Sequence, residues 1–174
     1  MDKAKLSKLI KETKELTLLY VEDDESIAEQ TLIILEKFFK NIISAKNGQE
    51  GVDKFNENHI DIIISDINMP KLNGLDMLLE IKQIDPNIVS LITTAHEESV
   101  YYQGALDLNV QGYLVKPLNL ETLVNKLISA LDIRKNFIDE AYKIHYLHNA
   151  NQKLIDMGFQ ISNKKSYENI LEII

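Results

Sequence analysis

The sequence predicts an α/β fold: a doubly wound, five-stranded parallel sheet with helices on both faces and a C-terminal helical extension. Five short runs rich in β-branched residues alternate with longer segments of helical periodicity along the chain. Strands that alternate with helices pair in parallel through right-handed crossovers, which places helices on both faces of the sheet. The 174 residues, 45% of them apolar, suffice for one such domain with a core and an extension.

The five predicted strands are short apolar runs. They are LTLLYV (16–21), NIISA (41–45), IDIIIS (60–65), NIVSLIT (87–93) and VQGYLV (110–115). Four of the six residues of the third run are isoleucine, a β-branched content typical of a strand that is buried on both faces. It is followed by a carboxylate, Asp66, and a charge at the end of so well buried a strand indicates a function at the edge of the sheet.

The segments between the runs carry apolar residues at three- and four-residue steps. One predicted helix covers SIAEQTLIILEKFF (26–39), and another covers GLDMLLEIKQI (74–84) and ends before Pro86. A third covers LETLVNKLISAL (120–131), with Asn119 as its N-cap. Its apolar residues share one face: Leu120, Leu123, Val124, Leu127 and Leu131.

Composition excludes several classes of function. The formal net charge of −8 argues against a nucleic-acid partner for this chain, because phosphate contacts need clustered Lys and Arg. The absence of cysteine excludes disulfides and thiolate chemistry. The N-terminal segment is too polar for a signal peptide, and no apolar run reaches membrane-spanning length. We therefore expect a cytoplasmic protein without a membrane partner.

Polar residues follow four of the five predicted strands. Because ligands bind outside the carboxyl ends of parallel strands, these side chains should converge on one crevice. Several carboxylates beside an oxygen-ligated cation, a lysine and a hydroxyl suit phosphoryl transfer, in which a carboxylate can be the nucleophile. Taken singly, each residue also fits an acidic loop, a strand or a turn. The converging residues are Glu22, Asp23, Asp24, Asp66, Thr93, Thr94 and Lys116.

Four motifs at these strand ends resemble the receiver domain of two-component response regulators, over roughly residues 16–133. They are VEDDE (21–25), DINMP (66–70) followed by Gly74, TTA (93–95) and YLVKP (113–117). The resemblance implies a flavodoxin-like fold with strand order 2-1-3-4-5. It also implies a cis peptide bond between Lys116 and Pro117.

The resemblance implies a role for each matching residue. Asp66 is the phosphoacceptor, Asp23 binds Mg²⁺ directly, and Glu22 binds it through water. The third protein ligand is the backbone carbonyl of Asn68, whose side chain then faces the phosphoryl group. A shift of the alignment by one residue would make Asp24 the ligand in place of Asp23.

The remaining motif residues are implied to read out the phosphorylation. Thr94 is the switch hydroxyl, Lys116 pairs with the phosphoryl group, and Tyr113 is the aromatic switch. From the residues alone, Tyr113 is a half-buried strand aromatic and His96 is a solvent-exposed loop residue.

The function implied is a signalling switch that accepts a phosphoryl group on Asp66. The donor is a sensor histidine kinase, a phosphotransfer protein or a small-molecule phosphodonor. The change then passes to an output domain or partner protein. Such a domain phosphorylates and dephosphorylates only itself, so we do not expect an enzyme. A haloacid dehalogenase-like phosphatase is the alternative, but it needs a second Asp where Asn68 stands and a hydroxyl where Pro70 stands.

Two flanks lie outside the resemblance. Residues 1–15 are expected to form a short helix or a frayed end. Residues 134–174 are expected to form a helical extension or linker. An alternative interpretation is that they include the start of a truncated output domain.

Apolar residues at seven-residue spacing indicate a coiled coil and a homodimer through residues 130–161, with Asn151 at a core position. Gly158 is expected to end the helix. An amphipathic helix that folds back on its own receiver domain, or a dimerising adaptor, are the alternatives.

Overall fold

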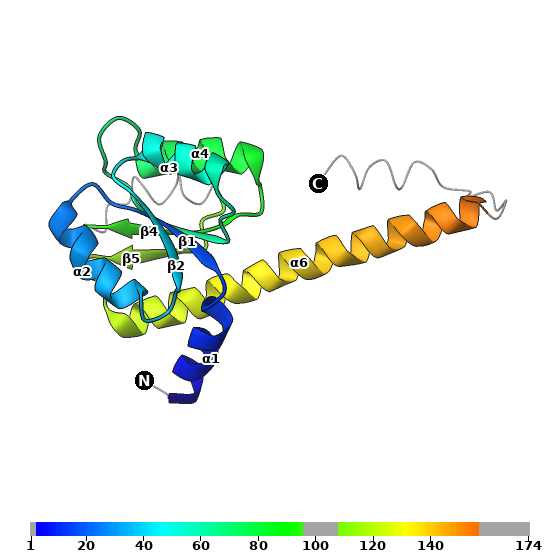
Figure 1. Cartoon of the computed structure of the whole chain (residues 1–174), viewed down its shortest axis with the longest axis horizontal. Coiled ribbons are helices and arrows are strands. Elements are labelled where there is room, and N and C mark those ends of the chain that lie inside the picture. Colours follow the sequence, from blue (N-terminus) through cyan, green and yellow to red (C-terminus); the bar gives the residue numbers. More distant parts are fainter. Residues whose placement is uncertain (1–2, 96–107, 157–174) are drawn as a thin grey trace. The chain divides into compact units, whose positions relative to one another are not determined.

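A computed structural model describes residues 3–95 and 108–156 (Figure 1). Its strands are β1 (Thr17–Val21), β2 (Asn41–Ala45), β3 (Ile62–Asp66), β4 (Val89–Thr94) and β5 (Gly112–Val115). Its helices are α1 (Lys3–Thr13), α2 (Glu25–Leu35), α3 (Gly48–Glu57), α4 (Gly74–Ile84) and α6 (Leu120–Asp156).

The five strands form one parallel sheet in the order β2-β1-β3-β4-β5. This confirms the predicted parallel fold and the strand order that the receiver resemblance implied. The order reverses at β1, so the carboxyl ends of β1 and β3 lie side by side at the point where such sheets bind ligands. Lys116-Pro117 is a cis peptide bond, as the resemblance also implied.

Helices cover both faces of the sheet. On one face, α3 and α4 pack over a buried cluster that includes Val52 of α3 and Met77, Leu78 and Ile81 of α4. On the other face lie α2 and the first turns of α6 (Figure 1). Buried side chains of α6 pack there: Leu123, Val124, Leu127, Ala130 and Leu131. Residues along each strand alternate between the two faces, and this alternation sets which side chains within the sheet lie on the same face.

Local sequence sets the helix ends. Asn119 accepts hydrogen bonds from the backbone N–H groups of Glu121 and Thr122, which confirms it as the N-cap of α6. The helix before Pro86 ends at Ile84, as predicted.

One helix prediction needs correction. The helix predicted over 26–39 covers only Glu25–Leu35, although Phe38 and Phe39 beyond it are buried. The apolar periodicity there reports burial rather than helix. Leu120 is 38% exposed at the first position of α6, whereas the other apolar residues of its predicted face are buried.

The N-terminal flank forms the helix α1. Leu9 and Thr13 of α1 are buried, and the Thr13 hydroxyl donates a hydrogen bond of 2.7 Å to the carbonyl of Phe38. A buried hydrogen bond of this kind fixes the end of α1 to the segment after α2.

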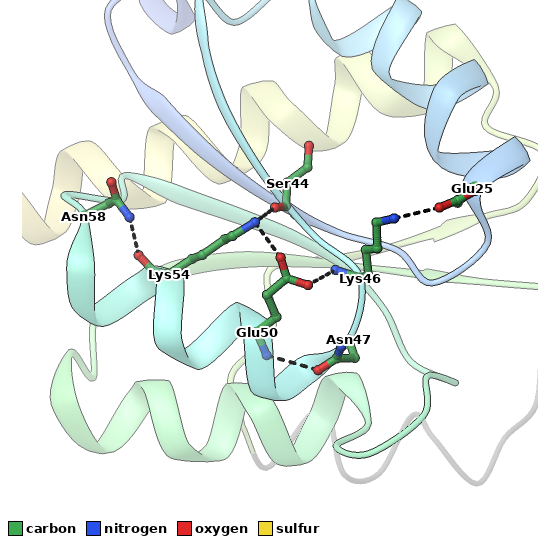
Figure 2. Close-up of polar contacts among 7 residues, drawn as sticks. All are labelled: Glu25, Ser44, Lys46, Asn47, Glu50, Lys54 and Asn58. Atoms are coloured by element: carbon green, nitrogen blue, oxygen red, sulfur yellow. Dashed lines mark hydrogen bonds and ion pairs between the residues drawn. The ribbon is translucent and has the colours of Figure 1, made fainter.

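Strand β2 forms one edge of the sheet, and ion pairs surround it (Figure 2). The ammonium group of Lys54 donates to the carbonyl of Ser44 and pairs with Glu50 at 2.6 Å. Lys46 pairs with Glu25 at 2.6 Å, and both of these side chains are exposed. Charged side chains over an edge strand hinder pairing with another chain, which favours a sheet that ends at β2.

Contacts divide the chain after Arg134, within α6. In the first unit, Arg134 pairs with the buried carboxylate of Asp61, whose other oxygen accepts a hydrogen bond of 2.8 Å from the backbone N–H of Thr17. In the second unit, α6 continues to Asp156, and several of its apolar side chains are exposed: Ile138, Tyr142, Tyr146, Leu147 and Ile155. Among the described residues, no helix has the length and apolar character needed to span a membrane.

Candidate functional site

The strand register aligns four polar side chains across the carboxyl edge of the sheet. Val21 of β1 is paired with Ser65 of β3, so Glu22 lies beside Asp66. Asp66 is paired with Thr93 of β4. Thr93 is paired with Leu114 of β5, and Lys116 follows two residues later on the same face. Glu22, Asp66, Thr93 and Lys116 therefore come from four neighbouring strands and share one face.

Three carboxylates meet at this edge. One oxygen from each of Glu22, Asp23 and Asp66 lies within 4.8 Å of the other two. Glu22 and Asp66 are buried, and Asp23 is exposed. Carboxylates held this close repel one another, and a hard divalent cation with oxygen ligands relieves that repulsion. The donor set of three carboxylate oxygens suits Mg²⁺.

Lys116 reaches two of these carboxylates. Its ammonium nitrogen lies 2.6 Å from Glu22 Oε2 and 3.0 Å from Asp66 Oδ2. The Lys116 side chain is only 11% exposed, and those of Glu22 and Asp66 are 1% and 10% exposed. One buried cation thus compensates two buried anions. The sequence placed Lys116 at this edge, but its contact with Glu22 was not anticipated.

The environment of Glu22 is strongly desolvated. Burial raises the pKa of the Glu22 carboxyl above its ordinary value, and the hydrogen bond and charge of Lys116 oppose that rise. The hydroxyl of Tyr20 donates to Glu22 Oε2 at 3.4 Å. Burial also raises the pKa of the Tyr20 phenol, so this group stays neutral and remains a donor.

Tyr20 is a residue of this site that was not predicted from the sequence. The signal was present, because Tyr20 precedes Glu22 by two residues and a strand places such residues on the same face.

Asp24 has a different role from its two neighbours. Its Oδ1 accepts hydrogen bonds from the N–H groups of Ser26 and Ile27, at 2.9 and 3.0 Å, and so caps α2. The acidic triad contains Asp23 and not Asp24. The capping role explains why the Asp24 carboxylate turns away from the triad.

The loop after β3 holds the Asp66 carboxylate in place. Asp66 Oδ1 accepts a hydrogen bond of 2.8 Å from the N–H of Ile67, and the Gly74 N–H donates to the carbonyl of Ile67 at 2.8 Å. A Cβ atom on Gly74 would lie 2.0 Å from the carbonyl oxygen of Asp66, so only glycine fits at the start of α4. The side chain of Asn68 in this loop is exposed.

Thr94 and Tyr113 lie on the face of the sheet that α3 and α4 cover. Thr94 is the last residue of β4 and is 5% exposed, and its carbonyl accepts a hydrogen bond of 2.8 Å from the N–H of Lys116. Tyr113 is half-buried against the buried cluster that α3 and α4 cover, and it is paired in register with Ile92. His96 lies outside the described residues.

Comparison with known proteins agrees with the receiver-domain resemblance of the sequence motifs. A family profile described as "Response regulator receiver domain" matches residues 18–128. A cyclic di-GMP phosphodiesterase of Thermotoga maritima is 30% identical over 139 residues, which cover 80% of this chain and 36% of that protein. The chain spans 28% to 61% of the length of this and other curated relatives.

Solved structures of receiver domains have folds similar to that of this chain. A response regulator receiver domain protein from Clostridium thermocellum has a TM-score of 0.65 and 30% identity, with 70% of this chain and 98% of that chain covered. A receiver domain of a response regulator from Saccharomyces cerevisiae, crystallised with a histidine phosphotransfer signaling protein, has a TM-score of 0.59 and 26% identity. That match covers 66% of this chain and 88% of the yeast chain.

Proposed function

Because this chain belongs to the response regulator receiver domain family, we propose that it is a phosphorylation-dependent switch in which Asp66 accepts the phosphoryl group. The observation that carries the proposal is the arrangement at the sheet edge. Asp66 lies within reach of two further carboxylates and is paired with the buried ammonium of Lys116. Asp66 also accepts a hydrogen bond from the backbone N–H of Ile67 and is paired in register with Thr93, and neither Glu22 nor Asp23 has this combination of contacts.

The chemistry proposed is a single displacement at phosphorus. One carboxylate oxygen of Asp66 attacks, and the bond from phosphorus to the donor's nitrogen or oxygen breaks, with the electron pair remaining on that leaving atom. The product is an acyl phosphate on Asp66. Mg²⁺ held by Glu22, Asp23, Asp66 and the backbone carbonyl of Asn68 would neutralise phosphoryl charge.

Incubation with acetyl phosphate and Mg²⁺ tests this assignment. Intact-mass analysis should find one added phosphoryl group on the wild type and none on Asp66→Asn. The amide keeps the size of the side chain and one oxygen to accept from the Ile67 N–H, but it loses the negative charge that pairs with Lys116 and is a poor nucleophile. Equal labelling of both proteins would refute the assignment.

Mg²⁺ binding should distinguish the two neighbouring aspartates. Asp23→Asn should weaken Mg²⁺ binding about tenfold or more, because it removes a charged ligand. Asp24→Asn is a matched control, since it removes one charge from the same loop while asparagine still caps α2. Titration calorimetry should find the control close to wild type, and the reverse order would show that Asp24 is the ligand.

The readout we propose uses Thr94 and Tyr113. Phosphorylation adds close to two negative charges and three acceptor oxygens at Asp66. Lys116 would then leave Glu22 for a phosphoryl oxygen, and the Thr94 hydroxyl would bond another. Movement of Thr94 inward opens space for Tyr113, which repacks the neighbouring surface. A difference of a few kcal/mol in how the phosphoryl group interacts with two existing conformations is enough to shift the equilibrium between them.

The partners follow from the family. A sensor histidine kinase or a phosphotransfer protein would supply the phosphoryl group, as the co-crystal structure of the yeast relative supports. The phosphodiesterase relative extends far beyond the matched region, which supports an output carried by a separate domain or partner. The receiver itself turns over no free substrate in this proposal.

We further propose a parallel coiled-coil dimer through residues 130–161, formed with a second copy of this chain. The continuous helix to Asp156 supports it, as do the half-buried Phe137 and Ile144 and the exposed Leu147, all at predicted core positions. Tyr142 and Tyr146 are more exposed but lie off this seam.

Sedimentation equilibrium should find a dimer for the full chain and a monomer for a chain that ends at Ile133. A monomer in both cases, with and without phosphorylation, would exclude the coiled coil.

A further inference from the structure

Thr93 carries a buried hydroxyl without a hydrogen-bond partner. The residue is 1% exposed, and Thr93 Oγ1 is one of two buried side-chain polar atoms that make no hydrogen bond among the described residues. The other is Ser90 Oγ, also on β4. Burial of an unpaired hydroxyl costs free energy, and valine would fill the same space in a strand without that cost. Stability alone therefore does not account for a hydroxyl at position 93.

Register places Thr93 between the residues of the proposed reaction. Thr93 is paired with Asp66 on one side and with Leu114 on the other, so its side chain lies on the face that carries Asp66 and Lys116. Thr94, the next residue, lies on the opposite face. Ser90 is also on that opposite face, three residues earlier in β4 and paired with Ile63.

The Lys116 side chain crosses the strand end that carries Thr93. Lys116 follows β5, whereas Asp66 ends β3, and β4 lies between them. Neighbouring strands are about 4.8 Å apart, so the Lys116 and Asp66 side chains together bridge about two such spacings. It arrives 3.0 Å from that oxygen. The Lys116 stem must therefore pass over the end of β4, above the Thr93 side chain.

The ammonium group has three N–H donors, and two of them face carboxylates in this structure. They point to Glu22 Oε2 and Asp66 Oδ2. Under the proposed function, the contact with Glu22 is exchanged for a phosphoryl oxygen. A hydrogen-bond acceptor at the end of β4, where Thr93 lies, would hold the ammonium group beside Asp66 during that exchange.

We propose that Thr93 is a positioning residue that acts through Lys116. Its hydroxyl accepts an N–H from the ammonium as Lys116 moves from Glu22 to the phosphoryl group. The inference rests on the proposed function and deepens it. It assigns to β4, the strand between Asp66 and Lys116, a hydroxyl that positions the Lys116 ammonium group. The missing partner of Thr93 in the unphosphorylated protein is then the consequence of a contact made in the other state.

Three variants of the full chain test the inference with acetyl phosphate and Mg²⁺. Thr93→Val keeps the shape and removes the hydroxyl, and it should be phosphorylated about three- to tenfold more slowly, as expected for one lost hydrogen bond. Thr93→Ser keeps the hydroxyl and should restore a rate near that of the wild type. Ser90→Ala removes the other unpartnered hydroxyl of β4 and should leave the rate unchanged.

Thermal unfolding separates this role from a structural one. Thr93→Val removes an unsatisfied buried group, so its melting temperature should equal or exceed that of the wild type. A slower reaction in an equally stable protein cannot come from misfolding. If the wild type is labelled and Thr93→Val is labelled equally fast, the inference fails alone. If the wild type takes up no phosphoryl group, the proposed function fails as well.

Discussion

Lys116→Met should destabilise the protein by about 3 kcal/mol at neutral pH in the absence of divalent cations. The substitution keeps an unbranched side chain of similar length but leaves the buried carboxylates of Glu22 and Asp66 without their cation. Urea unfolding with EDTA should show a lower midpoint with an unchanged slope. Mg²⁺ should recover part of the loss, because a bound cation would replace the missing charge.

Lys46→Met is the matched control. Lys46 also makes an ion pair of 2.6 Å, with Glu25, but both partners are exposed. Exposed pairs of this kind contribute little, so the control should change stability far less than Lys116→Met does. Equal losses in the two variants would contradict the buried role of Lys116.

The effect of Lys116→Met should also depend on pH. Burial raises the pKa of Glu22, and Lys116→Met removes the hydrogen bond and the charge of Lys116, which oppose that rise. The folded protein then binds a proton more readily than the unfolded chain, so acidification favours the folded state. The loss of stability should therefore be full above the raised pKa of Glu22 and should shrink as the pH falls through it.

Gly74→Ala should be the most damaging substitution in the loop after β3. The new Cβ would lie 2.0 Å from the carbonyl oxygen of Asp66, a backbone atom that can move only with the strand end. We expect a loss of about 3 kcal/mol or more and a large fall in phosphorylation rate, because Asp66 must shift. Chemical unfolding and acetyl phosphate labelling measure the two effects.

Gly112→Ala provides the control for this prediction. Its Cβ would lie 2.8 Å from Lys126 Cδ, in a long side chain that can rotate away, and 3.2 Å from Leu91 Cδ2. Gly112→Ala should therefore cost clearly less than Gly74→Ala and leave phosphorylation measurable. Similar losses would show that the clash at Asp66 does not govern the loop.

Much of this architecture could be predicted from sequence. Strand runs of β-branched residues, Pro86 after a helix and Asn119 before one are local signals, and each was confirmed. The strand order was different, because no local pattern encodes which strands are neighbours and the order came only from family resemblance. The helix over 26–39 was predicted too long because Phe38 and Phe39 are buried by tertiary contacts, not by helical periodicity.

The contacts within the site were harder to predict. The strand ends indicated that Glu22, Asp66 and Lys116 converge, but not that one ammonium pairs with two carboxylates across an intervening strand. That contact depends on lateral distances in the folded sheet. The unpartnered hydroxyl of Thr93 is likewise visible only once its neighbours are in place.

The most direct test of the central claim is to identify the phosphorylated residue. After treatment with acetyl phosphate and Mg²⁺, borohydride reduces an acyl phosphate on aspartate to homoserine, which peptide sequencing by mass spectrometry detects. We predict homoserine at position 66, with Asp23 and Glu22 unchanged. Reduction at position 22 or 23, or no reduced residue in a protein that takes up the phosphoryl group, would contradict the account.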